Sequence, residues 1–363
     1  MKYLLSFLML IHGLIHVMGF ANGFGFGKLP ALTKYISKPT GLLWLFAAML
    51  FTSSAVYYLL KKENWALFAV AAVVLSQVLI IWYWKDAKMG TAANILILLV
   101  AVPASGEWQF NRMYKKEVRR MLTQPINKSV SIITHEQVWL LPTAVQKWLQ
   151  ASGVVGRPAI KHVYLQQRGE MKNAPGGKWI PFEAEQHFST DPPSFLWKTK
   201  ISPSRFLFIN GRDKYEHGKG NMLIKAYGLF TIADSKGSQT DEGTLLRYLA
   251  ETCWFPTAAL NDYIKWETID DHSAKATMSY GGTTASGVFS FNKNGNIEKF
   301  EANRYYIKNN HSSLEKWQVT CIHHKTMNGI RIPVKNNVTW KLKEGDFKWL
   351  ELEITNIQFT FTI

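Results

Sequence analysis

The sequence has little charge and almost no cysteine. Charged residues make up 19% of its 363 residues and hydrophobic residues 47%, whereas an average globular domain has about 25% charged residues. This deficit argues against a disordered chain and predicts membrane segments. The two cysteines, Cys253 and Cys321, are too few for a disulfide framework and lack the C-x-x-C spacing of common zinc and dithiol sites.

Short motifs of well-known enzyme families are also missing. The sequence has no G-x-S-x-G elbow, Walker loop, dinucleotide glycine pattern, H-E-x-x-H or EF-hand loop. The glycine-rich residues 281–284 are more typical of a hairpin turn than of a phosphate-binding loop. His323 and His324 are neighbours in a predicted strand, so they point to opposite faces and do not form a metal pair. The sequence therefore reveals architecture better than chemistry, and it identifies no cofactor.

Positive charge is in excess along the whole chain. The formal net charge is +16, of which +5 falls before Asn111 and +11 after it. Such an excess favours anionic partners, and phospholipid head groups are the nearest ones for a membrane protein. No nucleic acid partner is expected, because the basic residues are scattered and no binding motif is present. The oligomeric state is not indicated.

Long apolar runs occupy the first third of the chain. A membrane-spanning helix needs about 20 apolar residues, and the expected spans are residues 3–20, 42–60, 65–84 and 91–106. The fourth is short and contains Pro103, so it is either a tilted span or a helix that enters from the interface. A cleaved signal peptide is a weaker reading of the first run, which is long and carries two histidines. Residues 1–110 are therefore predicted to form a transmembrane helical domain.

Lysine and arginine in the short flanks predict the orientation. The flanks on one side of the expected spans carry eight of these residues and those on the other side carry five. The richer side is expected to be cytoplasmic. This predicts a multi-pass protein of the bacterial inner (cytoplasmic) membrane, the lipid bilayer being its first partner, with the soluble domain in the cytoplasm.

Two histidines lie inside the first apolar run. His12 and His16, in H-G-L-I-H, are one helical turn apart on one face. Polar side chains at such depth are costly and often functional, and imidazole is a common ligand of metals and haem. The alternative is that both rings hydrogen-bond to neighbouring helices, which Gly13 and Gly19 would let approach closely. Both readings stay open.

The rest of the chain changes from helical to alternating patterns. Residues 111–134 are predicted to form a basic juxtamembrane connector. Residues 108–130 are basic and amphipathic, which is typical of a helix at the membrane surface, and Pro125 and Asn127 mark a break. Residues 135–150 predict a short helix. The β-rich soluble domain covers 135–363. Its expected strands are 160–172, 178–189, 194–202, 205–210, 221–230, 263–270, 273–280, 283–292, 297–306, 315–324, 336–343 and 347–359.

These patterns predict the fold class. About a dozen antiparallel strands in meander order imply a strongly curved sheet or an open barrel. One helical pattern, 241–260, interrupts the strands, and Asn210-Gly211 is read as a turn. The fold class is thus an α-helical membrane domain of about four helices plus a mainly antiparallel β domain with one inserted helix.

The inserted helix carries the strongest candidates for a site. Arg247 and Glu251 are four residues apart, with Trp254 just beyond, and such a pair could be no more than a helix salt bridge worth about 0.2 to 0.5 kcal/mol. A helix that crosses an open sheet would instead bring them towards a cavity. Further candidates for ligand binding are Arg212, Asp213 and, on an alternating strand face that could equally be solvated, Glu185.

Several blocks together resemble a known family. They are L-P-T-A-V-Q-K-W-L, W-I-P-F-E-A-E-Q, G-R-D-K-Y, L-L-R-Y-L-A-E-T-C-W-F-P-T-A-A-L, I-D-D-H-S-A-K-A-T, G-G-T-T-A-S and G-I-R-I-P, from residue 141 to 359. This pattern resembles an uncharacterised bacterial family classed as a domain of unknown function, with a membrane leader and a β-rich C-terminal domain. The resemblance implies no reaction, and Thr252-Cys253 lies in a variable slot of its block.

Three functional hypotheses follow. The first is a membrane-anchored binding module whose curved sheet holds a lipid-like or amphipathic ligand. The second is a membrane-bound enzyme in which Arg247, Glu251, Arg212 and Glu185 form a polar site, with a carboxylate as general base. The third is a haem or metal protein that uses His12 and His16. An apolar, aromatic cavity favours the first, whereas converging carboxylates with perturbed pKa values favour the second.

Overall fold

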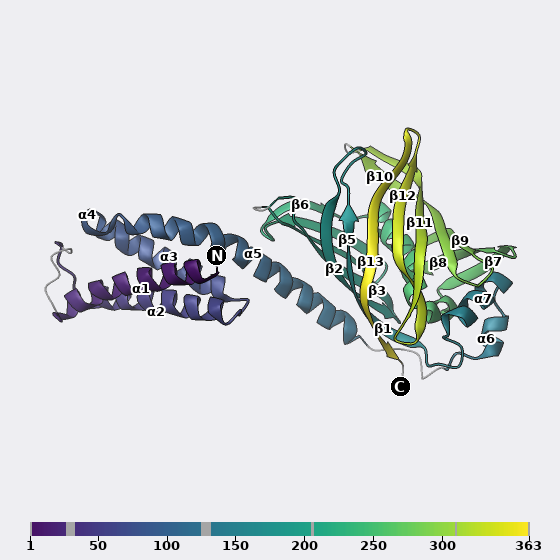
Figure 1. The fold of residues 1–363 in the computed structure, drawn as a ribbon, viewed down its shortest axis with the longest axis horizontal. Coiled ribbons are helices and arrows are strands. Elements are labelled where there is room, and N and C mark those ends of the chain that lie inside the picture. Colours follow the sequence, from purple (N-terminus) through teal and green to yellow (C-terminus); the bar gives the residue numbers. More distant parts are fainter. Residues whose placement is uncertain (1, 27–32, 125–131, 205–206, 309–310, 362–363) are drawn as a thin grey trace. The chain divides into compact units, whose positions relative to one another are not determined.

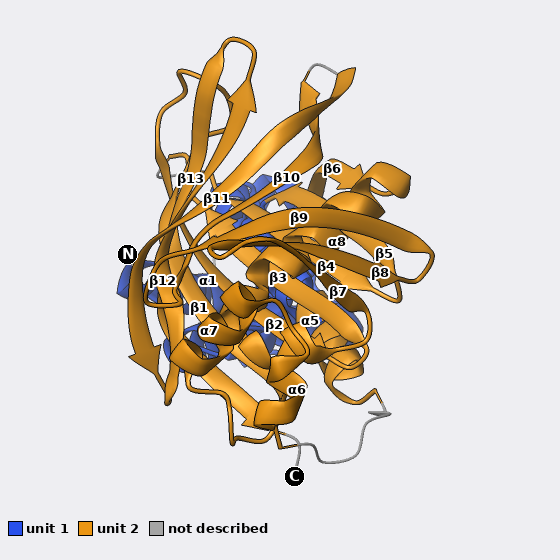
Figure 2. Ribbon diagram, turned by 90° about the vertical axis from the view of Figure 1, so that its right-hand side faces the viewer, with its two compact units in different colours: residues 1–112, 227–229 blue, residues 113–226, 230–363 orange. Residues whose placement is uncertain are grey.

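The structure is a computed structural model that describes residues 2–26, 33–124, 132–204, 207–308 and 311–361. It consists of two compact units, residues 1–112 with 227–229 and residues 113–226 with 230–363 (Figure 2). The first unit is helical and the second contains the sheet.

The first unit consists of long apolar helices. In the described part of the chain, four helices are long and apolar enough to cross a membrane, namely α1 (Lys2–Phe24), α2 (Lys38–Leu59), α3 (Trp65–Trp82) and α5 (Gly90–Leu122). A single turn, α4 (Trp84–Ala87), lies between the last two. All four predicted apolar runs are therefore helical, and their length suits a bilayer.

The fourth apolar run and the basic connector form one helix. α5 extends over 33 residues with Pro103 inside it, so the two predicted helices are continuous. A proline removes one backbone hydrogen bond of a helix, but apolar helices tolerate this better than soluble ones. The predicted break at Pro125 lies outside the described residues.

Glycines let α1 and α2 pack closely. A Cβ atom on Gly19 would overlap the indole of Trp44, and one on Gly13 would lie 3.2 Å from Cβ of Phe51. The close approach predicted at these two glycines is confirmed, and it follows the small-residue packing typical of membrane helices.

The second unit is built on one large sheet. Thirteen strands within the described residues form a single antiparallel sheet in the order β6-β5-β4-β3-β2-β1-β13-β12-β11-β10-β9-β8-β7 (Figure 1). Their bounds are β1 (Ile160–Met171), β2 (Ile180–Thr190), β3 (Pro193–Ile201), β4 (Ile209–Glu216), β5 (Lys219–Ala226), β6 (Phe230–Ser235), β7 (Ile264–Asp270), β8 (Ser273–Tyr280), β9 (Thr283–Phe291), β10 (Ile297–Lys308), β11 (His311–Met327), β12 (Ile330–Leu342) and β13 (Gly345–Phe361).

The inserted helix connects the two edges of the sheet. The chain leaves the sheet at β6, forms α8 (Ser238–Glu251) and two short 3-10 helices, η1 (Thr252–Trp254) and η2 (Pro256–Leu260), and returns at β7. The sheet curls around these helices as a half-barrel (Figure 1). We call the face that packs against α8 concave and the other convex. The predicted fold class, a curved antiparallel sheet with one inserted helix, is confirmed.

Apolar residues of α8 pack into the half-barrel. Leu245, Leu246 and Leu249 are at most 1% exposed and belong to one core with side chains from both halves of the sheet, among them Phe188 and Phe289. These apolar residues are therefore the side of the helix that meets the sheet.

Some predicted boundaries are wrong. The run 221–230 contains a hairpin, because Tyr227 and Gly228 both have positive φ values (54° and 68°) and turn the chain between β5 and β6. Asn210-Gly211 lies inside β4 rather than in a turn. The pattern 135–150 is two helices, α6 (His135–Trp139) and α7 (Thr143–Ser152), because Pro142 interrupts it.

Candidate functional site

Helix α8 is fixed to the concave face at its first turn. Asp241 accepts hydrogen bonds from the backbone amide of Gly220 (2.7 Å) and from Nζ of Lys219 (3.0 Å). A Cβ atom on Gly220 would overlap the side chain of Thr244, so glycine lets β5 pass close to the helix. The helix therefore has a defined position, and so do the side chains it presents.

Three of the predicted site residues form one ion cluster, which we call the Arg247 cluster: Arg247, Asp213 and Glu251. Arg247 Nη1 lies 2.7 Å from Asp213 Oδ2, and its Nε lies 2.8 Å from Glu251 Oε1. The side chains are only 16%, 12% and 12% exposed. The guanidinium also lies over the rings of Phe195 (5.0 Å) and Trp197 (4.8 Å). Two carboxylates and two rings thus fix its orientation.

Polar side chains of neighbouring strands extend the Arg247 cluster. Gln186 Nε2 donates to Glu251 Oε2 at 2.8 Å, and Trp197 Nε1 donates to Gln167 Oε1 at 2.8 Å. Burial raises the pKa of the Glu251 carboxyl above its ordinary value, although the charge of Arg247 opposes the shift. The outcome is a connected polar row on the concave face of β1 to β4.

Arg212 and Glu185 lie on the opposite face of the sheet. Arg212 is the strand neighbour of Asp213, and adjacent strand residues point to opposite faces. Glu185 forms an ion pair of 2.9 Å with Lys198. The four-residue polar site of the enzyme hypothesis is therefore not assembled, because the sheet separates Arg212 and Glu185 from Arg247.

Trp254 belongs to the core below the Arg247 cluster. It is 3% exposed, and its Nε1 donates to the carbonyl of Pro333 at 3.0 Å. The adjacent Cys253 is also buried, and burial raises the pKa of its thiol. Burial likewise raises the pKa of the Cys321 thiol to about 12. Neither thiol is a thiolate at neutral pH, so neither is an activated nucleophile.

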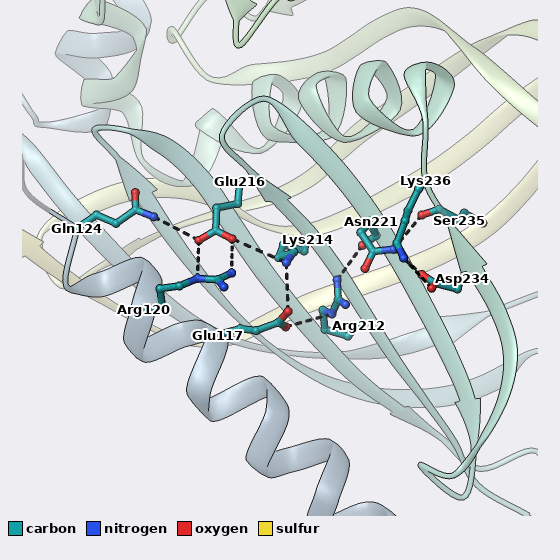
Figure 3. A network of polar contacts seen from close by, with 10 residues as sticks. All are labelled: Glu117, Arg120, Gln124, Arg212, Lys214, Glu216, Asn221, Asp234, Ser235 and Lys236. Carbon is teal, nitrogen blue, oxygen red and sulfur yellow. Dashed lines mark hydrogen bonds and ion pairs between the residues drawn. The ribbon is translucent and has the colours of Figure 1, made fainter.

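The convex face of β4 carries a second charged group, the α5 network: Glu117, Arg120, Arg212, Lys214 and Glu216 (Figure 3). Glu117 lies 3.2 Å from Arg212 and 3.1 Å from Lys214, and Glu216 binds Arg120. Each of these cations has a carboxylate within 4 Å. The network therefore attaches the last turns of α5 to the sheet and leaves no charge for a ligand.

A groove of about 930 Å³ lies where β1, β2, β12 and β13 meet. Its charged lining residues occupy strand positions that alternate with concave-face positions. They carry both signs and include Arg168, Lys200, Lys335, Glu183 and Glu353. Arg168 and Glu353 form an exposed ion pair of 2.9 Å. Since these charges compensate one another, the charged part of the groove selects no particular ligand, and we interpret that part as a solvated surface. Leu352, which also lines the groove, lies on the concave face.

Apolar side chains remain partly exposed on the concave face above the core. Val319, Cys321, Leu350 and Leu352 lie on β11 and β13, pack on the core from one side and are only half-buried, as is Trp197 on β3. We call these five residues the concave apolar strip. Cross-strand pairing through Val338 and Asn336 places the four residues of β11 and β13 on one face.

Arg304 is a concave-face residue that the sequence analysis misses. It lies on β10 on the same face as Phe300 and Ala302, which are buried. Its guanidinium carbon is 4.9 Å from the ring centroid of Trp317 and 6.0 Å from that of Trp340. A signal was present, because an arginine on the apolar face of an alternating pattern is unusual.

His12 and His16 lie side by side in α1, with ring centroids 4.8 Å apart. His12 Nε2 is 3.0 Å from Asn94 Oδ1 and 3.3 Å from Ser76 Oγ, and His16 Nδ1 is 2.8 Å from the backbone carbonyl of His12. Within the described residues, no cluster of three or more histidine, cysteine or acidic side chains is arranged to hold a metal. His12 therefore already has the hydrogen bonds that the packing reading requires.

Solved structures similar to this chain include the following two. A protein of the DUF1329 family from Desulfovibrio piger is 12% identical, covers 64% of this chain and 95% of its own, and has a TM-score of 0.35. A putative outer membrane lipoprotein-sorting protein domain from Vibrio parahaemolyticus is 11% identical, covers 56% and 87%, and has a TM-score of 0.34. At these scores neither informs the function of this chain.

No curated protein matches the sequence. A family model does match, over residues 140–359, which cover α7, the whole inserted helix and nearly all of the sheet. The blocks quoted from the sequence fall in this range. The chain therefore belongs to the family of unknown function DUF6920.

Proposed function

We propose that the protein is a membrane-anchored binding module whose β domain holds a lipid-like, amphipathic ligand on its concave face. The observation that supports this most is the concave apolar strip, which stays partly exposed beside the buried Arg247 cluster. Ligand sites in proteins are mostly apolar with a few polar groups that fix orientation. An acyl chain on the strip would bury apolar surface, which contributes a favourable free energy of about 25 cal/mol per Å² buried.

The membrane part of the proposal follows from the four apolar helices. Their length suits a bilayer, and the distribution of lysine and arginine favours a multi-pass protein of the bacterial inner membrane with the β domain in the cytoplasm. A phosphatase fused after Ile363 should be inactive and a fluorescent protein fused there should be bright. The opposite pair of results would place the β domain outside.

The binding proposal is tested on the full-length protein in detergent. Native mass spectrometry should detect a retained amphiphile, and the purified protein should bind dodecanoate or dodecanol. Leu352→Glu places a carboxylate in the concave apolar strip and should reduce binding at least tenfold, because a chain would then have to desolvate a charge.

The matched control is Gln358→Glu, which adds the same charge to an exposed position of β13 and should bind like the wild type. A wild-type protein that retains no amphiphile and binds neither probe would refute the proposed function.

A further inference from the structure

Two arginines lie on the concave face, and their surroundings differ. Arg247 has two carboxylates within hydrogen-bond distance. Arg304 has none: in the described parts of the chain, no residue hydrogen-bonds to its guanidinium or forms an ion pair with it. Glu315 is its direct cross-strand neighbour on β11, yet the two make no ion pair within 4 Å. Among the described residues, Arg304 is thus a cation without a hydrogen-bond or ion-pair partner.

The surroundings of Arg304 are built to hold it in place. Its guanidinium stacks on Trp317 and lies against Gly243 of α8, where a Cβ atom would be 3.2 Å from Nε and 3.5 Å from Nη2. Glycine at position 243 therefore makes room for the guanidinium next to the helix backbone. A guanidinium stacked on an indole keeps its N–H groups at the edge free for an anion.

A second donor beside Arg304 is also without a partner. Trp317 is 4% exposed, and its Nε1–H has no hydrogen bond acceptor among the residues that the structure describes. Buried donors are normally paired, and an unpaired one costs about 1 to 3 kcal/mol. One indole thus contacts an unpaired cation and carries an unpaired donor, and both need an acceptor.

The protein's own charges do not satisfy Arg304. Burial lowers its pKa to about 10, and the nearby Asp213 and Glu251 only partly offset this because both are bound to Arg247, whose charge lowers the pKa further. The fold therefore keeps a guanidinium in a position that disfavours its charge. An external anion would reverse that balance.

We infer that Arg304 binds the anionic group, a carboxylate or phosphate, of the ligand on the concave face, with Trp317 and Trp340 holding the guanidinium. This rests on the proposed function, since the apolar part of the same molecule would lie on the concave apolar strip. The ligand class is accordingly an anionic amphiphile. A free anion and an anionic head group would bind Arg304 through the same chemistry, and the experiment below distinguishes them.

The experiment compares dodecanoate with dodecanol, which differ in charge but carry the same chain. Binding is measured on full-length protein in one detergent at about pH 8, where the carboxylate is ionised. Wild type should prefer dodecanoate, and Arg304→Gln should weaken dodecanoate binding roughly 10- to 100-fold while dodecanol binding changes less than about twofold. Arg304→Lys should retain part of the preference.

The control is Arg168→Gln, which removes an exposed arginine of the groove and should leave both affinities unchanged. If Arg304→Gln does not fold, Glu315→Gln decides, because removing the opposing carboxylate should tighten dodecanoate binding only. Equal wild-type affinity for the two probes would overturn the inference and leave the proposed function standing.

Failure to bind either probe would instead overturn the proposed function as well. A third arm adds inorganic phosphate alone. If phosphate binds as tightly as dodecanoate and depends equally on Arg304, the site takes a free anion, and the amphiphile inference is wrong.

Discussion

Charged side chains are paired differently on the two faces of the sheet. On the convex face, the α5 network gives each of its cations a carboxylate and ties α5 to the sheet. On the concave face, Arg247 takes both nearby carboxylates, and Arg304 is left without one. Complete pairing suits a structural contact, whereas an unpaired cation needs something from outside the chain. The comparison therefore separates charges that hold the fold from a charge kept for a ligand.

The largest effect is expected for Arg247→Met. It leaves Asp213 and Glu251 buried without a cation, and breaking a buried ion pair costs about 3 to 5 kcal/mol. The Tm of the β domain should fall by roughly 10 °C, measured by tryptophan fluorescence. The triple variant with Asp213→Asn and Glu251→Gln should recover most of the loss. A change as small as that of the exposed Arg168→Met would mean that the cluster is only a surface bridge.

A smaller loss of stability is expected for a variant on the convex face. Glu117→Gln removes the counter-charge of Arg212, which is 5% exposed, and of Lys214, and an interaction with a charged group contributes about 1.5 to 3 kcal/mol. Urea unfolding of the full-length protein would measure this loss. Glu267→Gln, in an exposed ion pair with Lys275, is the matched control and should have no measurable effect. Equal midpoints for both variants would contradict the role given to the α5 network.

Arg304→Met should raise the stability of the protein, in contrast to the two variants above. The pKa of Arg304 is lowered to about 10, so the folded state disfavours its charge at every pH below that value. Stability linked to this group is complete above its unfolded pKa and is lost as the pH falls through about 10. At pH 7 without ligand, Arg304→Met should therefore stabilise the protein by about 1 kcal/mol. A loss of Tm comparable with that of Arg247→Met would remove the distinction between the two arginines.

The smallest effect on stability is expected in the apolar helices, where the polar contacts involve no carboxylate, lysine or arginine. Asn94 donates to Ser76 and Gln77 and contacts His12. Hydrogen bonds between membrane helices contribute about 0.6 kcal/mol on average, so Asn94→Leu should lower the stability of the helical unit by about that amount. Loss of helical circular dichroism during titration with a denaturing detergent measures it. A cost several times larger would show that this network matters as much as the charged ones.

Local patterns predicted most of the architecture. Alternation and turn residues located ten strands correctly or nearly so, and a helical pattern located the inserted helix. The hairpin at Tyr227-Gly228 was missed because a tyrosine with positive φ leaves no trace in an alternating pattern. The break before α7 was missed because the helical period continues across Pro142.

The candidate site was predicted only in part, for a geometric reason. Alternation shows that Arg212 and Asp213 point to opposite faces, but it does not show which face is concave. That depends on the direction in which the whole sheet curls, and no local pattern contains it. Asp213 joined Arg247 for this reason, whereas Arg212 did not. The alternating pattern carried a signal for Arg304, but the tryptophans on β11 and β12 that contact it come beside it only in the folded sheet.

The pairing of β1 with β13 joins residues as distant as Ile160 and Phe361 in the middle of the sheet. Strands β1 to β6 and β7 to β13 can each form from neighbouring hairpins, but the joint between them closes a long loop and costs chain entropy. Such non-local pairing slows folding. The two half-sheets can therefore join only after β13 has been synthesised, and until then the edge of β1 is open to wrong partners.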